Sequence, residues 1–226
     1  MPLTRQAKVL DDVQVTNLLR HVQRSSYAAA RNVAIVRLSF EAWLRATEIA
    51  GIRWRMLLDV SARLGPELRL EDVATKGRSG RVIPLSAGLA AALERLHRDE
   101  APVRPDGFVV RFRKHSADRV LRSQAVQALF RDWYGALGFR GCSSHSGRRT
   151  GITKAARQVT HLGGIGGSLR DVQLLAGHSS IATTQKYIDP NPAVHRRLVE
   201  LTAIRPVALK AGLPGRPAIL AAQEVS

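Results

Sequence analysis

The sequence predicts a mainly α-helical fold with a small antiparallel β-sheet, an α+β class. Apolar residues recur at helical spacing through most of the chain, and one pair of short segments alternates apolar and charged residues around a glycine-rich turn. The 226 residues are 45% hydrophobic and 23% charged, which are globular proportions. We expect one packed domain over residues 1–204 and a C-terminal arm over residues 205–226, where three prolines lie in a plain sequence.

The first part of the chain predicts helices. From Asp11 to Gly51 apolar residues follow helical spacing with few breakers, which indicates two or three helices. Gly51 is expected to end or bend the last of them, since glycine is favoured at helix C-termini.

A β-hairpin is expected next. Segments 67–73 and 81–85 alternate apolar and other residues, and the glycine-rich segment 75–80 lies between them and carries basic residues. Ser86 is then expected to cap a helix that runs through Leu96.

The second half returns to helices. A short strand at 108–110 is plausible, and a helix is expected from about Ser123 to Leu137. Ser143 or Ser144 is expected to cap the next helix, which would carry His145 and Arg148 inward.

Towards the C-terminus a glycine cluster at 163–167 interrupts the helical pattern. Helices are expected again over 171–176, 183–188 and 193–203, and the arm follows.

The charge balance points to a polyanionic partner. Lys and Arg number 35 against 18 Asp and Glu, which gives a net charge of +17 and a sequence pI of about 11.4. Arginine predominates, which suits bidentate binding of phosphate oxygens. Nucleic acid is the leading partner on charge, although a solubilising surface or a ribosome-type protein would have the same balance.

Cysteine usage and hydropathy exclude other classes. Cys142 is the single cysteine, so neither an internal disulfide framework nor a multi-cysteine zinc site can form. No apolar run approaches the roughly 20 residues of a membrane span, and the N-terminus lacks the apolar core of a signal peptide. We therefore expect a cytoplasmic, nucleoid-associated protein that has no membrane partner.

Four short motifs follow one another in the chain. They are LRATEI at 44–49, TKGRSGRVIPL at 75–85, HSGR at 145–148 and LLAGHSSIATTQKY at 174–187. In this order they resemble the LRxxE box, the KGxxxRxxPL hairpin, the HxxR box and the GHSS…TT…Y box of the tyrosine recombinase (phage integrase) family. LRxxE alone occurs on many surface helices, whereas the conjunction is specific to this family. The resemblance implies the catalytic-domain fold of the tyrosine recombinases for residues 1–204.

The residue types in these motifs suit phosphodiester chemistry without reference to any family. In-line cleavage needs a nucleophile, positive charge for the phosphorane, a base for the nucleophile and an acid for the leaving oxygen. Two arginines, two histidines, a lysine and a tyrosine supply these functions, so we expect neither a metal ion nor a cofactor.

The resemblance assigns roles to these residues. Tyr187 would attack the scissile phosphate and form a 3′-phosphotyrosine while a 5′-hydroxyl leaves. Arg45 and Arg148 would bind the non-bridging oxygens. His145 would be the base in cleavage, since a tyrosine with its ordinary pKa of about 10 needs one at neutral pH.

The remaining motif residues have supporting roles in the resemblance. Lys76 would protonate the leaving oxygen, His178 would hydrogen-bond the phosphate, and Glu48 would orient Arg45 or brace its helix. The other basic residues at the hairpin and beside the HxxR box would bind DNA; these are Arg78, Arg81 and Arg149. The implied partners are double-stranded DNA and further copies of the chain, usually a tetramer on two DNA sites, docked through the C-terminal arm.

Several alternatives stay open. The same active site would serve a type IB topoisomerase, and a non-catalytic DNA-binding regulator could share the fold. Arg45 and Glu48 could be an ordinary i,i+3 surface pair, and His145 or His178 could be core or capping histidines. Lys76 is one of several basic residues at the hairpin turn.

The chain also departs from the family pattern. About forty residues precede Arg45, where relatives commonly carry a separate DNA-clamping domain, so a short form or a fragment is expected. Gly147 replaces the usual apolar residue of the HxxR box and should loosen its helix. Arg149 stands where histidine is common. The sequence does not identify the target site or separate integration, inversion and excision.

Overall fold

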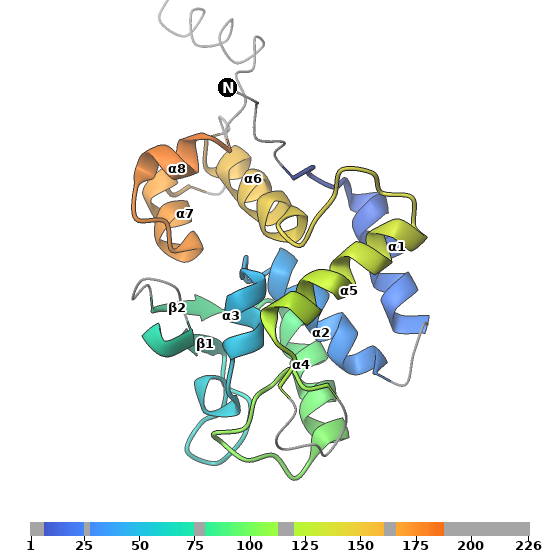
Figure 1. The fold of residues 1–226 in the computed structure, drawn as a ribbon. Helices are drawn as coiled ribbons and strands as arrows, with labels where there is room; N and C mark the ends of the chain where they lie inside the picture. Colours follow the sequence, from blue (N-terminus) through green and yellow to red (C-terminus); the bar gives the residue numbers. More distant parts are fainter. Residues whose placement is uncertain (1–6, 25–27, 75–79, 113–119, 161–165, 188–226) are drawn as a thin grey trace, which may run out of the picture. The chain divides into compact units, whose positions relative to one another are not determined.

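The computed structural model describes residues 7–24, 28–74, 80–112, 120–160 and 166–187 (Figure 1). These ranges are mainly helical with one two-stranded antiparallel sheet, as the sequence predicts. The elements are α1 (Asp12–Arg24), α2 (Ala29–Phe40), α3 (Ala46–Gly51), η1 (Trp54–Met56), β1 (Glu67–Leu70), η2 (Asp72–Ala74), β2 (Arg81–Pro84), α4 (Ala87–Glu100), α5 (Ser123–Ala136), α6 (Ser146–Thr160), α7 (Leu169–Ala176) and α8 (Ile181–Gln185). Contacts divide the chain into Met1–Asp189 and Pro190–Ser226, and the second unit lies outside the described residues.

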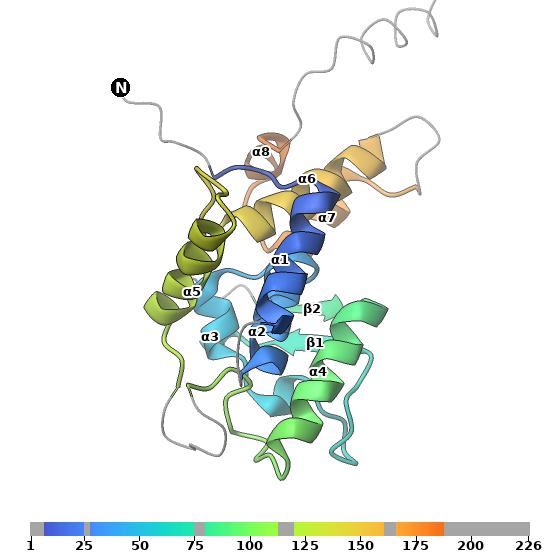
Figure 2. The ribbon, with the colours of Figure 1, turned by 90° about the vertical axis from the view of Figure 1, so that its right-hand side faces the viewer.

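Helix α2 organises the core. It packs against α1, α4 and α6, while α3 packs against α5 (Figures 1 and 2). The residues of α2 that face these neighbours are fully buried, Ile35 and Leu38 among them. Of the two or three helices expected from Asp11 to Gly51, the structure has three, and α3 ends at Gly51 as expected. Burial of α2 on several sides makes it the fixed element from which the neighbouring helices are positioned.

The hairpin is confirmed, with a shorter first strand. β1 pairs with β2 in antiparallel register from Glu67 opposite Pro84 to Leu70 opposite Arg81. The prediction that the first strand runs to 73 is wrong, since Asp72–Ala74 form the 3₁₀ turn η2. The Asp72 carboxylate accepts a hydrogen bond from the backbone N–H of Gly80 at 2.7 Å, which closes the base of the turn instead.

The predicted strand at 108–110 is also wrong. Phe108 forms an isolated bridge with Arg53, and the Val109 N–H donates to the Ile52 carbonyl at 2.9 Å. Val109 and Val110 are fully buried. The apolar run therefore reflects burial of an irregular segment rather than a strand.

Helix caps explain the boundaries around α4 and α7. The Ser86 hydroxyl accepts from the Leu89 N–H at 3.1 Å, which confirms the expected cap. Ser168 caps α7, because its hydroxyl accepts from the Asp171 N–H at 3.4 Å, and the Asp171 carboxylate accepts in return from the Ser168 N–H at 2.7 Å, which completes a capping box. Gly177 ends α7 with a φ of 62°.

The C-terminal elements differ slightly from expectation. Helix α7 begins two residues before 171, and α8 occupies Ile181–Gln185 and stops before Tyr187. The helix expected at 193–203 and the arm from 205 lie outside the described residues. No helix in the described part of the chain is long and apolar enough to cross a membrane.

Candidate active site

Helix α6 reaches the site through close packing on α2. A Cβ on Gly147 would lie 2.4 Å from the Ser39 hydroxyl, and one on Gly151 would lie 2.3 Å from the Phe40 carbonyl. Two glycines one turn apart therefore let the helix backbones approach. Gly147 does not merely loosen the helix, as the sequence suggests: it permits the contact that positions Arg148.

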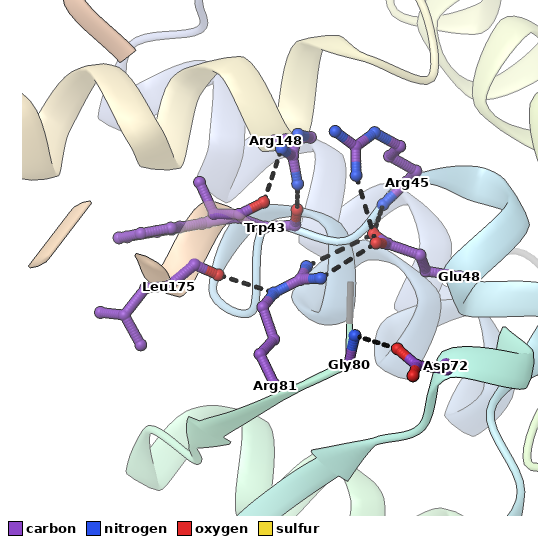
Figure 3. Close-up of polar contacts among 9 residues, drawn as sticks. Trp43, Arg45, Glu48, Asp72, Gly80, Arg81, Arg148 and Leu175 are labelled. Carbon is purple, nitrogen blue, oxygen red and sulfur yellow. Dashed lines mark hydrogen bonds and ion pairs between the residues drawn. The ribbon is translucent and has the colours of Figure 1, made fainter. Parts of the chain in front are cut away.

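Arg148 is buried between two backbone carbonyls (Figure 3). Its Nη1 donates to the Trp43 carbonyl and its Nη2 to the Ala176 carbonyl, the latter at 2.8 Å. Trp43 has a positive φ of 54°, so its carbonyl is presented by a turn that few large residues adopt. Burial, followed by the charge of Arg45, lowers the Arg148 pKa to about 10, which leaves it protonated at neutral pH.

Glu48 contacts both the backbone and the side chain of Arg45. Its carboxylate accepts from the Arg45 backbone N–H at 2.7 Å and from Arg45 Nη1 at 3.2 Å. It thus braces the first turn of α3 and orients the Arg45 guanidinium. Burial alone would raise the Glu48 pKa, but hydrogen bonding and charge from Arg81, with smaller effects from Arg45, lower it overall. Glu48 is therefore a buried carboxylate held ionised between arginines.

Arg81 is the second arginine beside the Glu48 carboxylate. Its side chain is 7% exposed, its Nη1 lies 3.1 Å from Glu48 Oε1, and its Nε donates to the Leu175 carbonyl at 2.8 Å (Figure 3). The DNA contact expected from the sequence would require a more exposed guanidinium. The two-residue period of a strand could have predicted this burial, since Arg81 shares the inward face of β2 with buried Ile83. Lys76 and Arg78 lie outside the described residues.

His178 follows the end of α7 and is buried. Its Nδ1 lies 3.0 Å from the Thr184 hydroxyl, and its carbonyl accepts from Gln173 Nε2 at 2.9 Å. Burial, then the charges of Arg148 and Arg45, lower the His178 pKa to about 4. The ring is therefore neutral at physiological pH. Gln173 and Thr184 were not singled out from the sequence, although Thr184 lies within the last motif.

Tyr187 lies against His178. The two rings stack with centroids 5.6 Å apart and an interplanar angle of 21°. The Arg149 guanidinium carbon lies 5.5 Å from the Tyr187 ring centroid, a cation–π contact. The ring also packs on a small apolar cluster of Ile152, Val172 and Ala176.

His145 lies at the edge of the site, directly before α6. Its N–H donates to the Ser143 hydroxyl at 3.3 Å, so Ser143 shapes the turn before α6 rather than capping an N–H within the helix, as was expected of Ser143 or Ser144. The side chain is exposed rather than directed inward. Partial desolvation, then the charges of Arg148 and Arg45, lower its pKa, so His145 is neutral at pH 7 and able to accept a proton.

These contacts bring most of the predicted residues into one neighbourhood. The cations of Arg45, Arg81 and Arg148 lie around the Glu48 carboxylate, beside a neutral imidazole and a phenol. Such an arrangement favours an anion with several oxygens. In the described part of the chain, no group of three His, Cys, Asp or Glu side chains could hold a metal ion.

Known proteins share this sequence and fold. The Phage integrase family profile matches residues 8–193. The chain is 31% identical over 193 residues to tyrosine recombinase XerC of Methylobacterium nodulans, which covers 85% of this chain and 54% of the relative. It thus spans about half the length of the curated relatives it matches.

Solved structures agree on the fold. The crystal structure of XerA recombinase has a TM-score of 0.63 at 19% identity and covers 91% of this chain and 67% of the other. The Tn1549 transposon integrase in complex with a circular intermediate DNA has a TM-score of 0.66 at 19% identity, and the match covers 88% of this chain and 67% of the integrase chain.

Proposed function

The chain belongs to the phage integrase family of tyrosine recombinases, and we propose that it cleaves and rejoins DNA at specific sites through a covalent bond to Tyr187. The observation that supports this most directly is the pair of arginines, Arg45 and Arg148, beside a tyrosine stacked on a neutral histidine. A phosphodiester brings the anionic oxygens that such a site would neutralise.

In the proposed reaction the Tyr187 phenolic oxygen attacks phosphorus and the 5′ oxygen leaves. His145 takes the phenolic proton, which its lowered pKa allows at neutral pH. A 3′-phosphotyrosine replaces one phosphodiester with another, so rejoining by the reverse step needs no added energy source. Lys76 is proposed to protonate the leaving oxygen.

Arg45 and Arg148 are proposed to bind the two non-bridging oxygens. A guanidinium has five N–H groups, and Arg148 gives one to each of two backbone carbonyls, so others can reach a phosphate. Both cations would stabilise the negative charge that develops in the transition state. Because their supports are backbone carbonyls and a buried carboxylate, little reorganisation would be needed when DNA binds.

His178 is proposed to act as a neutral hydrogen-bond donor. When Thr184 donates to Nδ1, the ring proton resides on Nε2, which can then donate to a phosphate oxygen. A neutral imidazole does this without adding a third cation to a site already crowded with positive charge.

The test is a pool of DNA duplexes with randomised sequence around a single nick, which traps a covalent intermediate because the short cleaved strand diffuses away. We expect a protein–DNA adduct with wild-type chain, enriched for one sequence, and none with Tyr187→Phe. Tyr134→Phe is the matched control, since its buried hydroxyl has no hydrogen-bond partner among the described residues and its loss should leave the adduct intact. Salt-sensitive binding without any adduct would contradict the proposal, and relaxation of plasmid with no enriched site would indicate a topoisomerase.

We further propose that residues 1–204 form the catalytic domain and that residues 205–226 form an arm that docks on a neighbouring copy, with four copies on two DNA sites. The support is the family's usual assembly and the tail's separation from the motifs. Light scattering of the chain on the enriched duplex should give a larger complex than the same chain ending at 204. Equal masses would contradict the arm's role.

A further inference from the structure

Arg81 is buried where an arginine on a basic hairpin is expected to face DNA. Its guanidinium lies between Glu48 of α3 and the last turn of α7 (Figure 3). One side chain on β2 therefore contacts two elements of the site. Gly80, just before it, is held by Asp72, so the end of the hairpin turn is also fixed at this point.

The turn after α7 is shaped around Arg81. Gly177 has a φ of 62°, and a Cβ there would lie 2.7 Å from Arg81 Nη1. His178 follows directly, and its N–H donates to the Gln173 carbonyl at 3.1 Å. The place of the His178 ring thus depends on a turn that accommodates the Arg81 guanidinium.

Glu48 extends the same contact to Arg45. Glu48 Oε1 lies 3.1 Å from Arg81 Nη1 and 3.2 Å from Arg45 Nη1, so two cations share one oxygen. Arg45 is 35% exposed on its side chain, whereas Glu48 is 1% exposed. Arg81 is thus the buried partner that keeps the carboxylate in the orientation that Arg45 uses.

We propose that Arg81 is a positioning residue that sets the spacing between Arg45 and His178, the groups that reach a scissile phosphate from α3 and from the turn after α7. The inference rests on the proposed function and adds a requirement to it. It also replaces the DNA-contact role that the sequence suggests for Arg81.

The test compares DNA binding with cleavage in Arg81→Met, using the nicked duplex enriched by the wild-type chain. At saturating DNA, we expect single-turnover cleavage to fall about 10- to 100-fold, because misplacement by about 1 Å costs on that order. The Kd and its salt dependence should stay close to wild type, since the guanidinium faces protein. Arg69→Met is the matched control: Arg69 lies on β1 with a side chain 76% exposed, so the same charge is lost from the same hairpin.

The pH profile adds a readout that a general loss of stability would not move. Without Arg81, Glu48 loses the two largest influences that lower its pKa while burial remains, so the Glu48 pKa rises relative to that in the wild-type chain. Protonation of Glu48 should therefore add to the decline of the cleavage rate on the acidic side in Arg81→Met and not in Arg69→Met. Arg81→Lys keeps a cation near Glu48 with a single nitrogen, so its rate should lie between those of wild type and Arg81→Met.

A double variant keeps the test usable if Arg81→Met fails to fold. Glu48→Gln combined with Arg81→Met removes both charges of this buried ion pair together and should fold. It should cleave as slowly as Glu48→Gln alone, with no further loss of rate, because both changes act through one contact.

Two results would overturn the inference. Normal cleavage at saturating DNA in Arg81→Met would show that Arg81 does not position the site. Weaker DNA binding in Arg81→Met, with a normal cleavage rate and a slope of log K against log salt smaller by about 1, would identify Arg81 as a phosphate contact. Absence of any adduct with the wild-type chain would overturn the proposed function and this inference together, whereas an adduct with unchanged variant kinetics would overturn this inference alone.

Discussion

Arg148 is held by backbone atoms rather than by a partner carboxylate. Two carbonyls, from Trp43 and Ala176, fix its planar group. Lysine has one nitrogen and cannot satisfy both carbonyls and a phosphate. We expect Arg148→Lys to lower single-turnover cleavage by about 100-fold or more, as loss of a transition-state donor does. Arg69→Lys is the control, and a rate within twofold of wild type for Arg148→Lys would contradict the assigned role.

His145 predicts how cleavage depends on pH. As a base it must be neutral, and its pKa is lowered from the ordinary value near 6.5 by partial desolvation and by Arg148 and Arg45. The rate should therefore be at its plateau at pH 7 and decline as the pH falls through the lowered pKa. Single-turnover rates from pH 5 to 8 measure this. In His145→Gln the slow residual reaction should lack that decline, and a persistent decline would assign it to another group.

The lowered pKa of His178 predicts a loss of stability in acid. Its folded pKa of about 4 lies below the unfolded value of about 6.5, so between these pH values the unfolded chain binds a proton that the folded chain does not. The free energy of unfolding should fall as pH drops through this window. Urea denaturation at pH 7 and pH 5 should show a smaller drop for His178→Asn than for the wild-type chain, and equal drops would contradict it.

The sequence predicted which residues lie near one another better than it predicted their orientation. The motifs indicated that Arg45, Arg148, His178 and Tyr187 are neighbours, and the structure places them so. The inward turn of Arg81 was missed, because charge alone suggests solvent and the strand is only four residues long. The carbonyl contacts of Arg148 could not be foreseen, since backbone partners leave no trace in side-chain identity.

At the scale of elements, the packing of α6 on α2 gives a matched test. Alanine at Gly147 would meet the Ser39 hydroxyl and the Phe40 ring at 2.4 and 2.7 Å, so the helices must separate. We expect Gly147→Ala to lower the free energy of unfolding by about 1–3 kcal/mol, typical of overpacking. A Cβ on Gly135 of α5 would meet no described residue within 4 Å outside its own helix backbone, so Gly135→Ala should instead raise the free energy of unfolding by about 0.5–1 kcal/mol.

Urea or thermal unfolding of Gly147→Ala and Gly135→Ala measures both changes in the free energy of unfolding. Two stabilised proteins would mean that α6 does not approach α2 this closely. Cleavage should also fall in Gly147→Ala and stay normal in Gly135→Ala, because Arg148 moves with α6.

Elements with strong periodicity or caps were predicted well from the sequence, and short ones were not. Ser86 and the pattern after it defined α4 correctly. At 108–110, tertiary burial produced an apolar run without strand pairing. The end of β1 was missed because Asp72 accepts a hydrogen bond across the turn, a contact that depends on where Gly80 lies in space.

For the whole molecule, the net charge of +17 predicts strongly salt-dependent DNA binding. Each phosphate that the protein neutralises releases counterions. The logarithm of the association constant should therefore fall linearly with the logarithm of the salt concentration, with a slope of about −0.9 per phosphate contacted. Fluorescence anisotropy between 50 and 200 mM salt should therefore show a steep decline for any duplex. An affinity independent of salt would contradict an electrostatic origin of binding.

The glycines of α6 also constrain how related chains can vary. A side chain at 147 has no space while Ser39 and Phe40 keep their places, so a bulkier residue there must be accompanied by a smaller one at 39 or 40, or by a wider gap between the helices. We therefore expect positions 39, 40 and 147 to covary, with total volume conserved across the three rather than at each one.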